Sequence, residues 1–392
     1  MNIAHRMAKI EPFHVMELMA KAKALEVSGR SILHLEVGEP DFPTAEPIVA
    51  AGVEFLRQGH VHYTPALGLP ELREAISNFY AERYKLNVPA ERIIVTAGAS
   101  GALLLALGVL VNPGSEWLQP DPGYPCNRHF VSLFEGLPRA VAVSSDTAYQ
   151  PTLEQLRAHW RSATRGLIVA SPSNPTGTLL TSSQLQTLWD EVRERSGTLI
   201  VDEIYHGLTY GVNAASALAL SEDIFVINSF SKYFGMTGWR LGWLVAPDAY
   251  VNQIEKLAQN LFICPSAIAQ HAALAAFRPT TISILEQRRQ LFSQRRDLLL
   301  KGLRGLGFKI DVEPQGAFYI YADIRALSSD SFYFAHQLLT DAGVAATPGV
   351  DFGGNHSAAY MRFAYTLETA GIEEALDRIS RFLGTRKKVR TD

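Results

Sequence analysis

The sequence predicts an α/β protein, with a large domain whose mostly parallel sheet is covered by helices and a smaller α+β domain formed by both termini. From about residue 92 onward, short apolar runs alternate with longer amphipathic segments, which is typical of parallel strands crossed by helices. Four runs have the length and character of buried strands: residues 93–95, 167–170, 199–201 and 225–227. Helices are expected between them at residues 101–111 and 183–195, the second begun by a serine-rich capping stretch.

The pattern changes after Pro279. Apolar pairs then recur every seven residues up to residue 299, with Arg and Gln between them, which predicts one long helix. A strand-like, a helical and a strand-like segment follow in that order: residues 316–321, 332–342 and 360–365. This arrangement indicates a second, smaller domain.

The N-terminal stretch, with a strand expected at residues 33–37, is too short for a core of its own. A chain of 392 residues fits two closely associated domains. We therefore expect an N-terminal segment over residues 1–45 that packs on the small domain, a large ligand-binding domain over residues 46–280, and an interdomain helix with the small domain over residues 281–392.

Composition excludes several classes of protein. Hydrophobic residues make up 47% of the chain and charged residues 19%, which is typical of globular enzymes. Because 36 Lys and Arg stand against 39 Asp and Glu, we expect no basic face for nucleic acid, and we expect the C-terminal cluster Arg386, Lys387, Lys388 and Arg390 to be a solvated tail. Two distant cysteines argue against a disulfide framework, and no apolar run is long enough to cross a bilayer. A cytoplasmic protein without a membrane partner is expected.

The richest segment surrounds Lys232, directly after the strand predicted at residues 225–227. Ligands of open α/β sheets bind at the carboxyl edge of the strands, and a partly desolvated lysine loses its proton more easily, as imine formation requires. Ser229 and Arg240 add a hydroxyl and a charged fork suited to phosphate. Together these residues predict a phosphorylated carbonyl ligand. The alternative is a surface loop with a solvated lysine and an arginine in a salt bridge.

Polar groups follow two further strands at the same edge. Asp202 ends the run at residues 199–201 and is suited to pair with a protonated pyridine nitrogen, with Tyr205 directed back at a phenolate oxygen. Asn174 lies in a proline-rich rigid turn, where its amide suits a phenolate and an incoming carboxylate. The alternatives are an Asp that caps the next helix and a turn that only connects elements.

A run of small residues between the strand at residues 93–95 and the next helix contains Ala99 and Ser100. Exposed backbone N–H groups at such a helix start form an anion site, although the run matches neither a P-loop nor a dinucleotide fingerprint. Tyr124, after the next strand, is suited to stack on a flat ring.

Taken together, these segments resemble the class I and II aminotransferases of fold type I, the aspartate aminotransferase superfamily, over essentially the whole chain. The pattern Ser-x-Ser-Lys-x-x-Gly-x-x-Gly-x-Arg-x-Gly around Lys232 carries the resemblance, with Asn174, Asp202, Tyr205 and Arg362 in their motifs. It implies that the large domain binds pyridoxal 5′-phosphate (PLP). It also implies a ping-pong transfer of an amino group from an L-amino acid to a 2-oxo acid, 2-oxoglutarate or pyruvate.

The resemblance also implies a role for each matching residue. Lys232 would form the Schiff base and act as general base, and Asp202 would hold the pyridinium. Asn174 and Tyr205 would bind the ring oxygen, and Tyr124 would stack on the ring face. The phosphate would be bound by Ala99, Ser100, Ser229 and Arg240.

Arg362 matches the arginine that binds the substrate α-carboxylate, assisted by Asn174 and the backbone of Gly38, the alternative being a structural ion pair. Tyr63 resembles the tyrosine that reaches the phosphate of the neighbouring subunit, which implies a homodimer with shared active sites. His60 and His62 form an HxH pair without a third ligand, so we expect no metal site.

Two other reactions or roles remain open: a PLP-dependent lyase acting on an amino acid, and a non-catalytic PLP-binding sensor. The slightly acidic chain has fewer than forty residues before its first predicted strand, which argues against the sensor. No second cation for a distal carboxylate is assigned. Phe13, His14 and Tyr124 suggest an aromatic lining that admits aromatic or aliphatic side chains.

Overall fold

The computed structural model describes the backbone of residues 3–391 and the side chains of residues 3–385. The side chains of the basic cluster Arg386, Lys387, Lys388 and Arg390 therefore lie outside the described residues. In the described part of the chain, no helix combines the length and apolar character that crossing a membrane requires.

Within residues 3–391, the central sheet has seven strands in the order β2-β8-β7-β6-β5-β3-β4. Their bounds are Ile93–Thr96 for β2, Glu116–Asp121 for β3, Leu137–Ala142 for β4, Thr164–Ala170 for β5, Thr198–Asp202 for β6, Phe225–Ser229 for β7 and Gly242–Val245 for β8. Neighbouring strands from β4 to β7 pair in parallel, whereas β8 is antiparallel to β2 and β7. The sheet is mostly parallel, and the four predicted strands lie within it.

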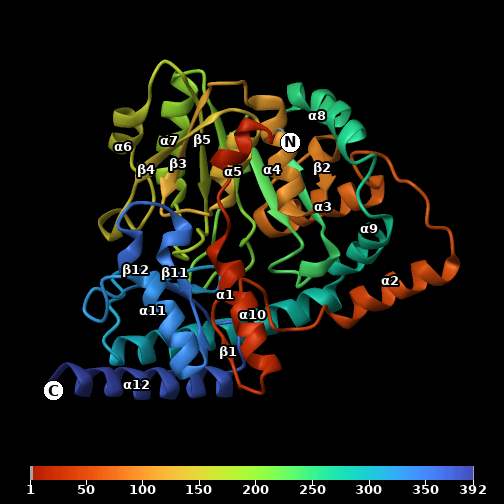
Figure 1. The fold of residues 1–392 in the computed structure, drawn as a ribbon. Coiled ribbons are helices and arrows are strands. Elements are labelled where there is room, and N and C mark those ends of the chain that lie inside the picture. The colour runs from red at the N-terminus through yellow and green to blue at the C-terminus, as the bar shows by residue number, and fades with distance from the viewer. Residues whose placement is uncertain (1–2, 392) are drawn as a thin grey trace.

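Helices cover both faces of this sheet (Figure 1). Residues of α4 and α8 pack with Ile94 and Ile168 on one face, whereas residues of α3, α6 and α7 share a core with Val95 and Val169 on the other. The bounds are Glu46–Gln58 for α2, Pro70–Tyr84 for α3, Gly98–Leu110 for α4, Cys126–Leu133 for α5, Leu153–His159 for α6, Ser182–Glu194 for α7, Asp248–Leu261 for α8 and Ala267–Ala273 for α9. Because both faces are buried, the four predicted strand runs are apolar throughout.

The predicted helices at residues 101–111 and 183–195 are α4 and α7. The cap of α7 is Thr181, whose side chain and that of Gln184 form a capping box, rather than the serines that follow it. The long helix expected after Pro279 is α10, Pro279–Gly305.

A smaller antiparallel sheet has the order β11-β12-β9 and lies near α10, α11 and α12 (Figure 1). The bounds are Tyr319–Asp323 for β9, Thr347–Pro348 for β11, Tyr360–Ala364 for β12, Ser331–Gln337 for α11 and Thr369–Thr391 for α12. The helix expected at residues 332–342 is α11 followed by a short π-helix at Leu338–Ala342. The strand expected at residues 316–321 begins later, at Tyr319.

The N-terminal stretch contains α1, His14–Val27, and β1, Leu33–His34, which pairs in parallel with β10, Val344–Ala345. The strand is shorter than the predicted 33–37, because the Glu36 carbonyl accepts hydrogen bonds from the side chains of Arg362 and Thr347 instead of a strand partner. Helix α1 contacts β10 and β11. The proposed domain bounds, residues 45 and 280, remain a prediction.

Candidate active site

A cavity of about 280 Å³ opens at the carboxyl edge of the central sheet. Most of the residues predicted for the site line it: Gly38, Ala99, Ser100, Tyr124, Asn174, Asp202, Tyr205, Lys232, Arg240 and Arg362. They come from separate strand ends, from the start of α4 and from the smaller sheet. Ser229 and Tyr63 lie outside this lining.

Lys232 follows β7 and extends into the cavity from the strand end. Its Nζ donates a hydrogen bond to the carbonyl of Gly38, at 2.5 Å. Burial lowers the pKa of Lys232 to about 8, and the positive charge of Arg362 acts in the same direction. A lysine with this pKa has a substantial neutral fraction near neutral pH, which nucleophilic attack on a carbonyl requires. The alternative of a solvated surface lysine is therefore wrong.

Asp202 is the last residue of β6 and is buried in the floor of the cavity. One carboxylate oxygen accepts the N–H of Ile204 at 3.0 Å. Burial raises the pKa of Asp202 to about 6. A cation placed against it would stabilise its charged form, so Asp202 is suited to bind a cationic group. Asp202 makes this contact within its own turn and also lines the cavity. The alternative of an Asp that only caps the next element therefore does not explain its position.

Tyr205 contacts a residue that the sequence analysis did not single out. The hydroxyls of Tyr205 and Tyr319 lie 2.9 Å apart, and both residues line the cavity. A Cβ atom at Gly38 would lie 2.4 Å from the Tyr319 hydroxyl, so the glycine allows the tyrosine its position. The signal in the sequence is the strand predicted at residues 316–321, on which Tyr319 shares a face with Tyr321, the cross-strand partner of Arg362.

Arg362 is buried on β12 and faces Asn174. Its Nη1 donates to Oδ1 of Asn174 at 2.9 Å, and its Nη2 donates to the Glu36 carbonyl at 2.7 Å. The guanidinium carbon lies 4.2 Å from the centroid of the Tyr319 ring. Among the residues whose side chains are described, Arg362 has no carboxylate partner, and its buried Nε has no hydrogen-bond partner. The alternative of a structural ion pair is therefore wrong, and the charge is available to a substrate carboxylate.

Another part of the cavity lining is suited to an anion. Ala99 and Ser100 lie in the first turn of α4, whose N-cap residue makes no side-chain hydrogen bond to the helix, so the backbone N–H groups are directed at the cavity. The guanidinium of Arg240 donates to the Thr237 carbonyl at 3.0 Å. A Cβ atom at Gly98, where φ is +72°, would lie 2.6 Å from Nη2 of Arg240, so the glycine allows this approach.

Ser229 was expected to contact the phosphate. Its buried hydroxyl lies 3.0 Å from the carbonyl of Leu241 and 3.0 Å from Oγ of Ser231, and its role at the phosphate stays a prediction. The neighbouring Ser231 lines the cavity instead, next to Arg240, whose Nη1 lies 3.4 Å from its Oγ. Ser229 is the last residue of β7, whereas Ser231 belongs to the turn that follows.

The remaining wall of the cavity is largely apolar. It includes Phe13, as expected, and side chains of α1 and of neighbouring segments that the sequence analysis did not single out: Val15, Met16, Met19, Val37, Leu103 and Ile204. The expectation that His14 belongs to the aromatic lining is wrong, since its ring packs against Phe332 at a centroid distance of 5.4 Å and does not line the cavity. The wall is therefore more aliphatic than predicted.

Tyr63 lies between α2 and α3 with 81% of its surface exposed. Its predicted contact with the phosphate of a neighbouring subunit concerns a second chain, so this role stays a prediction.

The family model for "Aminotransferase class I and II" matches residues 30–379. A valine–pyruvate aminotransferase of Mycobacterium tuberculosis is 36% identical over 378 residues, covering 96% of this chain and 97% of the relative. A (5-formylfuran-3-yl)methyl phosphate transaminase of Methanocaldococcus jannaschii is 37% identical, covering 97% and 99%. The crystal structure of an aminotransferase from M. tuberculosis matches with a TM-score of 0.95 and 37% identity, over 98% of this chain and 100% of that one. With Lys232, Asp202 and Arg362 gathered in one cavity, the chain belongs to the class I and II aminotransferases.

Proposed function

We propose that this aminotransferase uses PLP, bound to Lys232, to move the amino group of an L-amino acid with an apolar side chain to a 2-oxo acid such as pyruvate or 2-oxoglutarate. The observation that carries the proposal is the half-buried lysine of lowered pKa, placed in one cavity with the carboxylate of Asp202 and with Arg362, which has no carboxylate partner among the described side chains. The residues present fit the cofactor in size, charge and hydrogen bonding.

Each part of the cofactor has a matching group in the cavity. The start of α4 and Arg240 suit the phosphate, Asp202 suits the ring nitrogen, and Tyr205 with Asn174 suits the ring oxygen. When bound, PLP supplies an aldehyde for the amine and a ring that withdraws electrons from the substrate Cα. The protein supplies the position and the charges.

Lys232 has two tasks in this proposal. Its neutral amine would hold the cofactor covalently, and the same amine, when free, would take up the proton from the substrate Cα. Arg362 and Asn174 bind the carboxylate of the substrate and so hold the Cα within reach of the base. The buried setting excludes water from this proton transfer.

The donor is assigned from the apolar wall. The cations that line the cavity are Lys232, Arg240 and Arg362, and each of them already has a role in this proposal. An aliphatic side chain gains from burial against such a wall, whereas a second carboxylate would lose its hydration without a partner. The naming of a relative as a valine–pyruvate aminotransferase agrees with this choice.

We also propose a homodimer that shares its active sites. The exposed apolar side chains Val49, Val53 and Leu56 of α2 and the exposed Tyr63 support this. Helix α2 and the segment after it extend to one side of the molecule (Figure 1), where a second copy has access. The two free thiols are in keeping with a reducing compartment, and we place the protein in the cytoplasm.

The test is the absorbance spectrum of the purified protein with PLP, before and after L-valine, L-leucine, L-phenylalanine or L-aspartate is added singly. The expected result is a visible band that shifts to the spectrum of the pyridoxamine form with an apolar amino acid and returns with pyruvate or 2-oxoglutarate. A preference for aspartate over all three apolar amino acids would refute the substrate assignment. Release of ammonia and pyruvate from a cysteine conjugate without amino transfer would indicate a lyase instead, and a band that never shifts would support the sensor.

A further inference from the structure

Helix α1 forms the side of the cavity where the substrate side chain is proposed to lie. Val15, Met16 and Met19, all in the first half of this helix, line the cavity, and Met19 lies one turn beyond the other two. In Figure 1 the helix lies beside the smaller sheet, and it contacts β11 and β10. Its position therefore determines the shape of the substrate pocket.

The start of α1 is held by a carboxylate. Asp351 accepts the backbone N–H groups of His14 and Val15, both at 2.8 Å, one with each carboxylate oxygen. The two bonds satisfy N–H groups that have no partner inside the helix, and the negative charge is favourable at a helix N-terminus.

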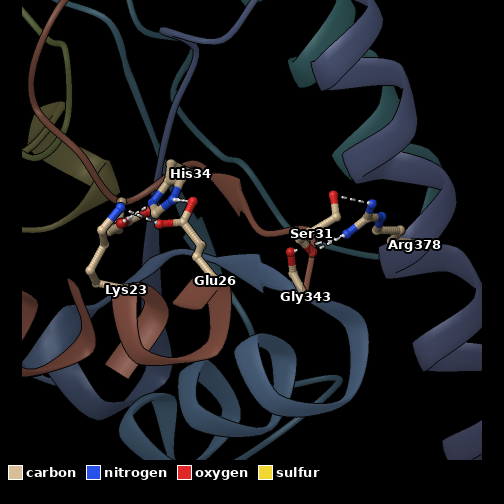
Figure 2. Close-up of polar contacts among 7 residues, drawn as sticks. Lys23, Glu26, Ser31, His34, Gly343 and Arg378 are labelled. Atoms are coloured by element: carbon tan, nitrogen blue, oxygen red, sulfur yellow. Dashed lines mark hydrogen bonds and ion pairs between the residues drawn. The ribbon is translucent and has the colours of Figure 1, made fainter. Parts of the chain in front are cut away.

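The end of α1 is held by a chain of three ionisable side chains. Nε2 of His34 lies 3.2 Å from Oε1 of Glu26, in the last turn of the helix, and its Nδ1 lies 2.7 Å from Oε1 of Glu36. Figure 2 shows His34 on its strand with Glu26 and Lys23 of the helix beside it. Glu36 is fully buried and is part of the cavity lining, so these three side chains connect the end of α1 with the wall of the pocket.

We propose that His34 is a positioning residue: as an imidazolium between Glu26 and Glu36 it holds α1 over the cavity and so sets the affinity for the side chain of the amino-acid donor. The proposal rests on the aminotransferase function with an apolar donor given above. It adds a residue that touches neither substrate nor cofactor and acts through the helix.

Charge explains why the histidine is needed. Within the described residues, Oε2 of Glu36 is buried without a hydrogen-bond partner, so His34 is the cation that offsets this carboxylate. The hydrogen bond to Glu36 raises the pKa of His34 from 6.5 to about 9, with a smaller contribution from Glu26. Removing the cation would leave a buried carboxylate uncompensated, which is costly.

Other charged groups lie near Glu26, His34 and Glu36. On α1, Lys23 contacts Glu26 at 3.2 Å, and Lys21 contacts His336 of α11 at 3.2 Å. On α12, Arg378 donates to the carbonyl of Ser31 at 2.8 Å, on the far side of the strand in Figure 2. This last contact anchors the strand but not α1.

The direction of the pH effect follows from the raised pKa. Because the folded-state pKa of His34, about 9, lies above the ordinary value of 6.5, the contact of His34 with Glu26 and Glu36 stabilises the position of α1 fully below about pH 6.5. This stabilisation is lost as the pH rises through about 9. At neutral pH the imidazole is charged and the helix is held.

The test compares the PLP-loaded wild type with His34→Gln, Glu26→Gln and the control Arg378→Gln, which cuts an anchor of the same strand that does not reach α1. Hydrogen exchange of residues 14–27 at pH 7 reports on the helix without any need for turnover. We expect protection to fall roughly tenfold in His34→Gln and several-fold in Glu26→Gln, as for a lost charge-assisted hydrogen bond. Arg378→Gln should leave α1 unchanged. Glu26→Gln keeps the buried pair intact, so it stays informative if His34→Gln fails to fold.

The same variants are then assayed with the most active amino acid of the spectral panel. KM for the donor should rise about tenfold in His34→Gln while kcat changes less than twofold, and the ratio of mutant to wild-type KM should approach one above pH 9. Unchanged exchange in α1, or loosened exchange with unchanged KM, would overturn the proposal. Failure of every amino acid to shift the spectrum would instead refute the proposed function, and the exchange experiment would still decide whether His34 holds the helix.

Discussion

The two sides of the cavity are held in different ways. On the cofactor side, Asp202 and Lys232 sit at or directly after the ends of β6 and β7, in a sheet buried on both faces. On the donor side, much of the wall is helix α1. Asp351 holds the start of this helix, and the contact of His34 with Glu26 and Glu36 holds its end. The chemical groups therefore rest on rigid elements, whereas the donor pocket depends on a few ionisable contacts. Variants on the first side should change the rate, and those on the second should change the affinity for the donor.

The largest effect is expected for Lys232→Ala, which removes both the covalent bond and the base. Positioned acid–base groups alone contribute roughly 10²–10⁴-fold, so we expect turnover to fall by at least about 10⁴-fold while some PLP stays bound through the phosphate site. Single-turnover assays and the absorbance of the loaded protein measure both. The control is Lys256→Ala, an exposed lysine of α8, which should behave as wild type. Near-normal turnover by Lys232→Ala would disprove the mechanism.

The cofactor side is also the side that the sequence predicts well. Asp202 and Lys232 could be placed because each follows an apolar run, and parallel strands bring their ends to one edge. The same reasoning did not show which of Ser229 and Ser231 lines the cavity, because the end of β7 could not be located to within two residues from an apolar run. Strand β4 was not predicted, since as an edge strand it is partly exposed and has no continuous apolar run.

Contacts between segments far apart in the sequence, one on the cofactor side and the others on the donor side, could be predicted only in part. Tyr319 contacts Tyr205 across 114 positions of sequence, and His34 contacts Glu26 only because α1 folds back beside β1. Contacts of this kind depend on tertiary packing and leave no spacing in the sequence. The sequence predicted that the N-terminal segment packs on the small domain, but it did not predict that three side chains of α1 line the cavity.

Arg362→Leu tests the boundary between the two sides. The guanidinium binds the carboxylate with charge-assisted hydrogen bonds, so we expect KM for the donor to rise by about 10²-fold with a smaller change in kcat. Because the guanidinium also contacts the Asn174 amide and the Tyr319 ring, the absorbance of the bound cofactor reports whether these groups keep their places, and we expect it to stay as in wild type. Steady-state kinetics with one saturating 2-oxo acid measure the split. An unchanged KM would mean that the carboxylate binds elsewhere.

The pH dependence of cofactor loading isolates Lys232. The neutral amine reacts, and with a pKa of about 8 its fraction rises as the pH increases from 7 to 9. We therefore expect the rate at which the cofactor-free protein binds PLP covalently to rise by about tenfold over this interval and then to level off. Stopped-flow absorbance follows the visible band. A rate that still climbs steeply at pH 10 would show that the lysine titrates as it does in water.

The smallest effect is expected for Tyr319→Phe, which keeps the ring beside Arg362 and removes only the hydroxyl that meets Tyr205. Losing one neutral hydrogen bond corresponds to roughly a two- to tenfold effect, and we expect it in kcat and in PLP affinity rather than in KM for the donor. Tyr321→Phe is the matched control, because Tyr321 lies on the same face of β9 and its buried hydroxyl has no hydrogen-bond partner within the described residues. If both variants behaved alike, the pair of tyrosines would have no part in holding the cofactor, and the effect of position 319 would come from its ring alone.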